Sequence, residues 1–321
     1  MKSTIPIFFA TDDNYTPYLS VAINSIKDNA SKNYHYNIHI LHQGLNENNI
    51  QDLKSYEDEC FTIYFDDVQD SLKKFASELF VRDYYSKATY YRIFIPSIFT
   101  EYDKILYLDC DITVKGDISE LYNTEIGDNY LGAITDEAVQ NIPNFYEYVE
   151  NFLGIKRQDY FNAGILVINL AKMREIHFEK RFMDILSKYK FVVAQDQDYL
   201  NVLCKGKVTY ISKIWNKQPI QDNNLTINDI KLVHYNLSAK PWHYDDILYE
   251  DLFWKYAKKS NRIEDIMKHK HDFDDQAKAT DYNNGSKLIE LAGVLSKDAN
   301  TFKHLVERGV INLNNLGQTH N

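Results

Sequence analysis

The chain has 321 residues, of which 36 are basic and 46 are acidic, so its formal net charge is -10 at pH 7. An acidic protein repels a long phosphate backbone, which argues against nucleic acid as a partner. With 44% hydrophobic residues, 25 Tyr and 17 Phe, the composition excludes a disordered chain. The length allows one large α/β domain with an accessory segment.

The first apolar run, IPIFFA, is too short for a transmembrane span or a signal-peptide core, and it leads directly into TDDNY. We therefore interpret it as a strand and expect no integral membrane span. The cysteines at positions 60, 110 and 204 form no close-spaced pair and are odd in number, which argues against a disulfide framework or a zinc knuckle. A reducing cytoplasm fits this pattern, and we expect a cytoplasmic location.

Short apolar runs separated by helical patterns predict an α/β fold. Strands are predicted at 4–10, 36–41, 61–65, 104–108, 130–134 and 164–170. Helices are predicted at 17–28, 46–58, 85–95 and 173–189, with Asn46 as the N-cap of the second. Alternation of the two indicates βαβ units and a mostly parallel sheet, whose ligands bind beyond the carboxyl ends of the strands. We expect TDDNY, DCD and YFNAG to converge on that edge.

Composition changes near residue 258, after the aromatic-rich WHYDDILYEDLFWKY. We predict a main domain over residues 1–258 and a C-terminal helical segment over 259–321. Within that segment, residues 286–308 have spaced apolar residues suited to one or two amphipathic helices that pack against the main domain. The charges there are mixed, without a basic face, so the pattern does not indicate membrane attachment.

Two carboxylates follow the predicted strand 104–108. Asp109 and Asp111 of LYLDCD are two residues apart, which on an extended chain places both side chains on one face, about 6.6 Å apart. Both can bind one divalent cation, and a metal there could offset the charge of a diphosphate leaving group. Acidic pairs at strand ends are also common as solvated turn residues, so the motif alone leaves both interpretations open.

The same residues fit a second chemistry. In LDCDIT the first aspartate could be a nucleophile that forms an aspartyl phosphate, with the second as a general acid. This pattern resembles the haloacid dehalogenase-type phosphohydrolases. Those enzymes usually carry the motif on their first strand, whereas more than 100 residues precede it here.

No glycine-rich dinucleotide motif or P-loop occurs, so a nucleotide would have to be bound in another way. In TDDNY, Asp12 can accept a hydrogen bond from a pyrimidine N3–H, Asn14 can donate to a carbonyl, and Tyr15 can stack on the ring. Uracil matches these groups. A helix-capping turn is the alternative explanation.

Further polar residues can complete a site for a sugar nucleotide. His234 of VHYNLSAKPW can be an imidazole ligand, and with two carboxylates it would suit manganese or magnesium, while Lys240 offers a charge to phosphate. Arg92 can face a phosphate or a sugar, or form a structural salt bridge. Side chains that can form hydrogen bonds to sugar hydroxyls occur in YFNAG and AQDQDYLN, namely Asn162, Asp196 and Gln197.

Six motifs occur together along the chain: FATDDNY, TYYR, LYLDCD, YFNAGILVINL, DQDYLN and HYNLSAKPW. In order and spacing they resemble the family-eight retaining glycosyltransferases, with similarity to lipooligosaccharide galactosyltransferases and glycogenin over residues 7 to about 245. The resemblance implies a GT-A fold, with a Rossmann-like, mostly parallel sheet flanked by helices. It also implies transfer of galactose or glucose from a UDP-sugar to a saccharide, glycolipid or glycoprotein acceptor in cell-surface polysaccharide or lipopolysaccharide synthesis.

The resemblance assigns roles residue by residue. It implies that manganese, or magnesium in its place, is bound by Asp109, Asp111 and His234. It implies that the nucleotide is bound by Ala10, Asp12, Asn14, Tyr15 and Lys240. Around the donor sugar it places Arg92, Asn162 and Asp196, and as candidate catalytic residues it gives Gln197, Asp196 and Asp136, the last lying between donor and acceptor.

One position departs from the resemblance. Some relatives have a glycine three residues after the metal-binding histidine, where the backbone can approach phosphate closely. This chain has Leu237 there, so backbone contact to the diphosphate is in doubt.

The mechanism implied by the family is retention, with the acceptor hydroxyl attacking from the face that UDP leaves. A covalent route would need Gln197 or Asp196 as the nucleophile, and an amide is a poor one. A phosphohydrolase with Asp109 as nucleophile and a non-catalytic sugar-nucleotide or glycan-binding protein are the alternatives. The sequence does not distinguish galactose from glucose, and it does not identify the acceptor, the linkage or the oligomeric state. Attachment to the inner face of the membrane is also left open.

Overall fold

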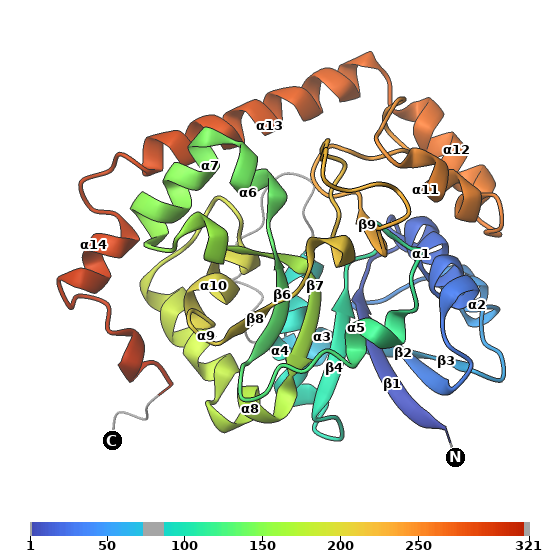
Figure 1. The fold of residues 1–321 in the computed structure, drawn as a ribbon, viewed down its shortest axis with the longest axis horizontal. Helices are drawn as coiled ribbons and strands as arrows, with labels where there is room; N and C mark the ends of the chain where they lie inside the picture. Colours follow the sequence, from blue (N-terminus) through green and yellow to red (C-terminus); the bar gives the residue numbers. More distant parts are fainter. Residues whose placement is uncertain (1, 73–86, 318–321) are drawn as a thin grey trace.

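The computed structural model describes residues 2–72 and 87–317 (Figure 1). A seven-stranded sheet with the order β3-β2-β1-β4-β7-β6-β8 lies at its centre. Its strands are β1 (Ser3–Ala10), β2 (Tyr34–His42), β3 (Phe61–Asp67), β4 (Lys104–Leu108), β6 (Leu131–Thr135), β7 (Phe161–Asn169) and β8 (Val208–Tyr210). Within this sheet only β7 runs antiparallel to its neighbours. The predicted mostly parallel sheet is confirmed.

Helices cover both faces of the sheet, which is why its central strands have long runs of buried apolar residues on both faces. On β1, alternate residues face opposite layers. Ile7 and Phe9 pack with α1 (Thr16–Asn29) and α2 (Glu47–Lys54), whereas Phe8 packs in a second cluster with α4 (Tyr91–Ile98) and α9 (Phe178–Lys188). The first cluster lies on one side of the sheet and the second on the other.

The predicted helices are present with altered ends. Asn46 caps α2, since its side-chain oxygen accepts a hydrogen bond from the N–H of Asn49. The helix predicted over 173–189 is divided into α8 (Leu170–Glu175) and α9, because His177 adopts a left-handed φ of 51° between them. Of the helix predicted over 85–95, residues 85 and 86 lie outside the described residues, and the remainder forms the 3-10 turn η1 (Lys87–Tyr90) followed by α4.

The C-terminal region is helical and packs onto the α/β core. It contains α11 (Glu250–Ala257), α12 (Ile263–Asp272), α13 (Asp275–Leu295), α14 (Phe302–Glu307) and the turn η5 (Leu313–Asn315). In Figure 1, α13 crosses the top of the molecule above α7 (Pro143–Glu147), which it contacts together with the π-helix η2 (Tyr148–Leu153). Leu288 and Ala292 of α13 and Phe302 of α14 are buried in the core. The division at residue 258 stays a prediction.

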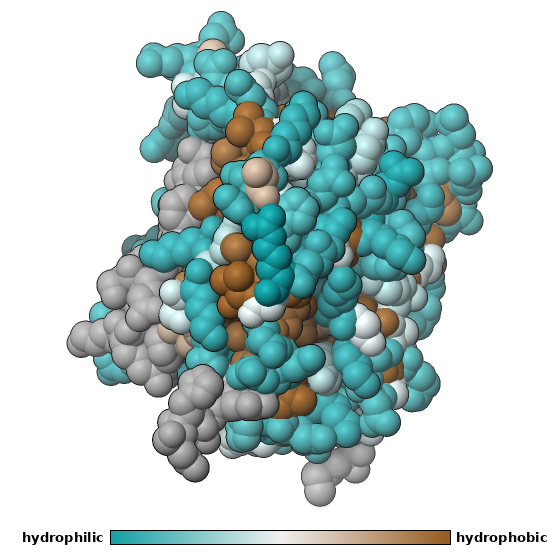
Figure 2. All heavy atoms as spheres, turned by 90° about the vertical axis from the view of Figure 1, so that its left-hand side faces the viewer, coloured by the Kyte–Doolittle hydropathy of each residue, from teal (hydrophilic) through white to brown (hydrophobic). Residues whose placement is uncertain are grey.

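The face that carries α14 is shown in Figure 2, where hydrophilic residues predominate and apolar residues form small patches between them. Among the described residues, no helix is long and apolar enough to cross a membrane. The shorter elements of the chain are α3 (Gln69–Leu72), β5 (Ile112–Val114), α5 (Ile118–Tyr122), α6 (Glu137–Asn141), η3 (Arg157–Asp159), α10 (Asp196–Leu203), η4 (Lys213–Trp215) and β9 (Leu232–His234).

Candidate active site

The site forms at the edge of the sheet where β1 and β4 end. The direction of β7 explains how YFNAG joins it. Because β7 is antiparallel to β4, its first residues lie at the same edge as the last residues of β4. The N–H of Asp109 accordingly donates to the carbonyl of Gly164, at 2.8 Å. The expected convergence is confirmed, although the strand begins earlier than the predicted residue 164, so Asn162 lies within it rather than before it.

A second, two-stranded sheet brings His234 to the same place. Strand β5 begins one residue after Asp111 and pairs antiparallel with β9, with Ile112 opposite His234. The N–H of Tyr235 also donates to the carbonyl of Asp111, at 2.8 Å. Residues more than 100 positions apart in the sequence are therefore held together by backbone pairing.

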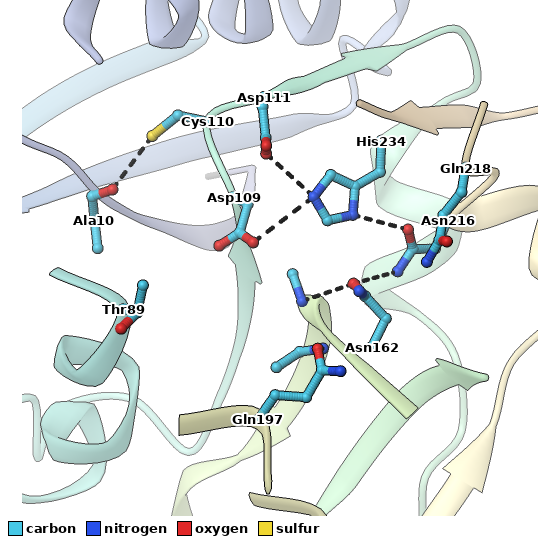
Figure 3. A network of polar contacts seen from close by, with 12 residues as sticks. Ala10, Thr89, Asp109, Cys110, Asp111, Asn162, Gln197, Asn216, Gln218 and His234 are labelled. Carbon is cyan, nitrogen blue, oxygen red and sulfur yellow. Dashed lines mark hydrogen bonds and ion pairs between the residues drawn. The ribbon is translucent and has the colours of Figure 1, made fainter. Parts of the chain in front are cut away.

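Asp109, Asp111 and His234 form a cluster that fits a divalent cation (Figure 3). One ligand atom from each residue lies within 4.8 Å of those of the others. Nε2 of His234 is 3.1 Å from Oδ1 of Asp111 and 3.7 Å from Oδ2 of Asp109. Two carboxylates and one imidazole are a donor set suited to manganese or magnesium.

Gly164 leaves room for this cluster. A Cβ atom at that position would lie 2.4 Å from Cε1 of His234 and 2.6 Å from Oδ2 of Asp109. Both distances are far below van der Waals contact. The absence of a side chain at this position of β7 is thus a steric condition for the two ligands to approach one another.

Charged groups next to the cluster control its ionisation. Burial alone would raise the pKa of Asp111, but the positive charge of Lys240, with a smaller contribution from the neighbouring His234, outweighs burial and holds that pKa below its usual range. Lys240 is buried and its ammonium group donates directly to Asp111. Asp111 is therefore ionised at neutral pH and available as a ligand.

Arg92 is buried beneath the cluster and orients two carboxylates. Its guanidinium group donates to Oδ1 of Asp109 at 3.0 Å and lies 3.2 Å from Oδ2 of Asp196. Burial, the largest effect, raises the pKa of Asp196 to about 6, and the positive charge of Arg92 opposes this rise. The structural salt bridge considered for Arg92 is present, and its role at the donor sugar stays a prediction.

The TDDNY segment contributes one wall of the same cavity. Ala10, Asp12 and Tyr15 line it, whereas Asn14 is exposed and is not among the lining residues. Oδ1 of Asp12 accepts hydrogen bonds from the N–H groups of Asn14 and Tyr15, at 3.0 and 3.2 Å. These bonds form a turn just before α1, whose N-cap residue is Tyr15 without a side-chain cap, so the helix cap considered as the alternative is not formed by Asp12 or Asn14. Nucleotide binding by these residues stays a prediction.

Asp136 lies deep in the site and its oxygens are fully engaged. Its Oδ1 accepts from the N–H groups of Ala138 and Val139 at the start of α6, at 2.9 and 3.2 Å. Its Oδ2 accepts from the amides of Asn162 and Gln197, at 3.0 and 3.1 Å. Asp136 therefore holds the neighbouring amide groups in place by accepting their hydrogen bonds.

Three amide residues of the site were not singled out from the sequence. Asn216 bonds to His234, Gln218 donates to Asp136, and Gln195 lines the cavity. Gln195 is 3% exposed, neither polar atom of its amide has a hydrogen-bond partner among the described residues, and its backbone φ is 48°. The strained backbone and the buried amide together identify it as a candidate ligand contact. Its position in AQDQDYLN, directly before Asp196, is the sequence feature that could have indicated it.

All remaining predicted site residues line one cavity with these groups, namely Arg92, Asp109, Asp111, Asp136, Asn162, Asp196, Gln197, His234 and Lys240.

Comparison with known proteins identifies the family, because the sequence profile of glycosyl transferase family 8 matches residues 6–246. The chain belongs to glycosyl transferase family 8.

Individual relatives match over a similar part of the chain. The chain is 33% identical over 253 residues to a putative glycosyltransferase of Haemophilus influenzae, covering 75% of this chain and 74% of that protein. It is 26% identical over 261 residues to a lipopolysaccharide 1,2-glucosyltransferase of Escherichia coli, covering 75% and 74%. The solved structure of galactosyltransferase LgtC, in complex with donor and acceptor sugar analogs, matches with a TM-score of 0.67 and 30% identity over 80% of this chain and 96% of LgtC.

Family membership and the GT-A-like structural neighbour confirm the predicted family and fold. They favour a transferase over the phosphohydrolase considered above. The position of LYLDCD agrees with this, since it follows the fourth strand of the chain rather than the first.

Proposed function

We propose that this family 8 chain is a retaining, metal-dependent hexosyltransferase. It moves galactose or glucose from a UDP-sugar to a hydroxyl group of a saccharide, glycolipid or glycoprotein acceptor. The observation that carries the proposal is the combination, in one cavity, of the Asp109–Asp111–His234 cluster with Lys240 and with the wall formed by Asp12 and Tyr15. The names of the relatives, a lipopolysaccharide glucosyltransferase and a galactosyltransferase, support the two hexoses.

Each group has a defined role in the proposed reaction. Asp109, Asp111 and His234 would hold manganese or magnesium, which supplies Lewis-acid stabilisation of the diphosphate when bound. Lys240, which contacts Asp111, places a second positive charge beside the phosphates. Tyr15 offers a ring to the uracil, and the unpartnered amide of Gln195 offers hydrogen bonds to the ligand.

The hydrogen bonds of Gln197 support attack from the front face. Its Oε1 accepts from the N–H of Ala163 at 2.9 Å, and its Nε2 donates to Asp136. The amide oxygen is therefore occupied, which makes it a still weaker nucleophile. In the proposed step the acceptor oxygen bonds to the anomeric carbon as the bond to UDP breaks, and the hydroxyl proton passes to a phosphate oxygen of the departing UDP.

We also propose that residues 1–258 form the catalytic domain and that the C-terminal segment 259–321 completes its cavity. Leu288 of α13 lines the cavity on the side formed by Val139 and Phe145. This apolar side is suited to the nonpolar face of an acceptor sugar or to an attached apolar group. A cytoplasmic location stays a prediction.

Release of UDP tests the proposed function. Purified full chain should release UDP from UDP-galactose or UDP-glucose only when manganese or magnesium is added. The Asp109→Asn/Asp111→Asn double variant should lose this release by at least about 1,000-fold, because it removes both carboxylate ligands. Unchanged release in the double variant would exclude the metal site. Release of inorganic phosphate from small esters would indicate a phosphohydrolase, and donor binding without turnover would indicate a binding protein.

Replacing Gln197 separates the two mechanisms. We expect Gln197→Ala to lower hexose transfer by about 10- to 100-fold, because one or two hydrogen bonds to charged or buried groups are lost. The measurement is the initial rate of transfer together with the dissociation constant for UDP. Complete loss of transfer with intact UDP binding would instead indicate that Gln197 forms a covalent bond to the sugar.

A further inference from the structure

We propose that Asn216 is a positioning residue of the metal site, which fixes the imidazole of His234 in the tautomer that carries its hydrogen on Nδ1. This tautomer leaves the lone pair of Nε2 directed at Asp109 and Asp111. The inference rests on the proposed function for the identity of the ligand, a divalent cation, but concerns only the protein's own hydrogen bonds.

The inference starts from a chain of buried hydrogen bonds that runs through the site (Figure 3). Nδ1 of His234 lies 3.0 Å from Oδ1 of Asn216. Nδ2 of Asn216 donates to Oδ1 of Asn162 at 2.9 Å. The same oxygen accepts from the N–H of Gly164 at 3.0 Å, and Nδ2 of Asn162 donates to Oδ2 of Asp136 at 3.0 Å.

The orientation of the first amide in this chain is fixed from two sides. A backbone N–H can only donate, so the side-chain atom of Asn162 that faces Gly164 must be its oxygen. An ionised carboxylate can only accept, so the atom that faces Asp136 must be the amide nitrogen. Asp136 is itself held by the backbone N–H groups of Ala138 and Val139. The two partners independently require the same orientation of Asn162.

This orientation passes to His234 through one further residue. Because Asn162 offers an oxygen to Asn216, Asn216 must present its nitrogen there and its oxygen to the imidazole. Nδ1 of His234 must then carry a hydrogen, and in the neutral ring Nε2 has none. Nε2 is the ring nitrogen that faces both aspartates, at 3.1 Å from Asp111 and 3.7 Å from Asp109.

Burial makes the orientation difficult to reverse. His234, Asn216, Asn162 and Asp136 are 2%, 1%, 5% and 4% exposed, so bulk water does not replace a lost partner. A reversed amide at Asn216 would place a donor against Nδ1–H and an acceptor against the oxygen of Asn162, leaving buried groups unpaired. Hydrogen bonds from neighbouring residues orient histidine ligands in metal sites in this way, and their loss typically lowers metal affinity by about 10- to 100-fold.

The test reads whether Nδ1 of His234 carries hydrogen in the metal-free full chain, by 15N chemical shifts and ring couplings. The signal is assigned by its absence in His234→Gln. Manganese affinity is measured in parallel by calorimetry. The wild-type protein is expected to show hydrogen on Nδ1.

Two replacements of Asn216 distinguish positioning from a merely structural role. Asn216→Leu removes the acceptor, and we expect a mixture of tautomers and manganese binding weakened by about 10- to 100-fold. Asn216→Asp keeps an oxygen opposite Nδ1, and we expect the wild-type tautomer to persist even though a buried carboxylate lowers thermal stability more than leucine does. If Asn216 has only a structural role, the order is reversed: the less stable Asn216→Asp variant should show the larger change in the His234 tautomer and in manganese binding.

A matched control and two outcomes complete the test. Asn129→Leu removes a side-chain hydrogen bond to Thr209 away from the cavity and should leave tautomer and manganese affinity unchanged. Hydrogen that stays on Nδ1 to the same extent in Asn216→Leu, or an Nδ1 without hydrogen in the wild-type protein, would overturn the inference. Because no donor or turnover is involved, absence of UDP release with the expected tautomer would refute the proposed function alone.

Discussion

Gly164→Ala is expected to weaken manganese binding by at least about 100-fold and to abolish most metal-dependent UDP release, while the protein still folds. The new Cβ would lie 2.4 Å from Cε1 of His234 and 2.6 Å from Oδ2 of Asp109, so both ligands must move apart. Neither moves easily, because His234 is 2% exposed and Asp109 is ion-paired to Arg92. The alanine itself fits the backbone, since Gly164 lies in an extended strand.

Gly285→Ala provides the matched control for this prediction. The same chemical change is made there at a position where, in the described part of the chain, no atom beyond the helix's own backbone and the adjacent residues lies within 4 Å of the new Cβ. Position 285 lies inside α13, where alanine is favoured over glycine by about 1 kcal/mol, so this variant should be as stable as the wild-type protein or more so. Wild-type manganese affinity in Gly164→Ala would show that the two ligands do not need the space that this glycine leaves.

Local sequence patterns were sufficient to predict the sheet and two of its three polar clusters. The runs IPIFFA and ILYL are apolar at every position because both faces of β1 and β4 are covered, and the residues that follow such strands must lie at their carboxyl edge. YFNAG reaches that edge for a reason absent from the local pattern. Only the antiparallel pairing of β7 with β4 places the beginning of one strand beside the end of the other.

The residues that support the metal site could not be predicted in the same way. Asn216 and Gln218 lie in an irregular segment, and the hydrogen-bond partners of their side chains are 18 to 82 positions away. The β5–β9 pairing that brings Asp111 to His234 involves strands of three residues each, too short to give a periodic signal. The residue type of His234 made it a candidate ligand, but its place beside Asp109 and Asp111 was implied only by the family resemblance and not by its own spacing.

Leu237 adopts a backbone conformation that favours glycine. The residue has a φ of 50°, in the left-handed region that glycine favours, at the position where some relatives have glycine. For leucine this conformation is unfavourable by roughly 1–2 kcal/mol. The residue lines the cavity beside Lys240 and Asn236, and this location is consistent with strain retained at a binding site.

Lys217→Met is expected to lower the free energy of unfolding by about 3–5 kcal/mol, the largest stability effect that we predict for a single side chain. Lys217 is 0% exposed, and its ammonium group lies 2.9 Å from Oε2 of Glu137. It also donates to the carbonyls of Gln218 and Ile220, at 2.8 and 2.6 Å. Methionine fills the space but leaves the carboxylate of Glu137 and two carbonyls without their donor.

Two further variants test whether the unpaired charge is the cause. Lys213 forms an ion pair with Asp222 but is 43% exposed, so Lys213→Met should change the free energy of unfolding by less than about 1 kcal/mol. Adding Glu137→Gln to Lys217→Met removes the buried charge and should restore part of the loss in chemical denaturation. A Lys217→Met protein as stable as Lys213→Met would contradict the prediction.

The same variant links stability to the site, because Glu137 is adjacent to Asp136. The carboxylate of Glu137 accepts from the N–H of Gln218 at 2.9 Å, and the side chain of Gln218 contacts both Asp136 and the N–H of Ala138. Movement of Glu137 in Lys217→Met should therefore displace the acceptor at the far end of the chain that orients His234. We expect manganese affinity to fall in Lys217→Met, measured well below its unfolding temperature, and not in Lys213→Met.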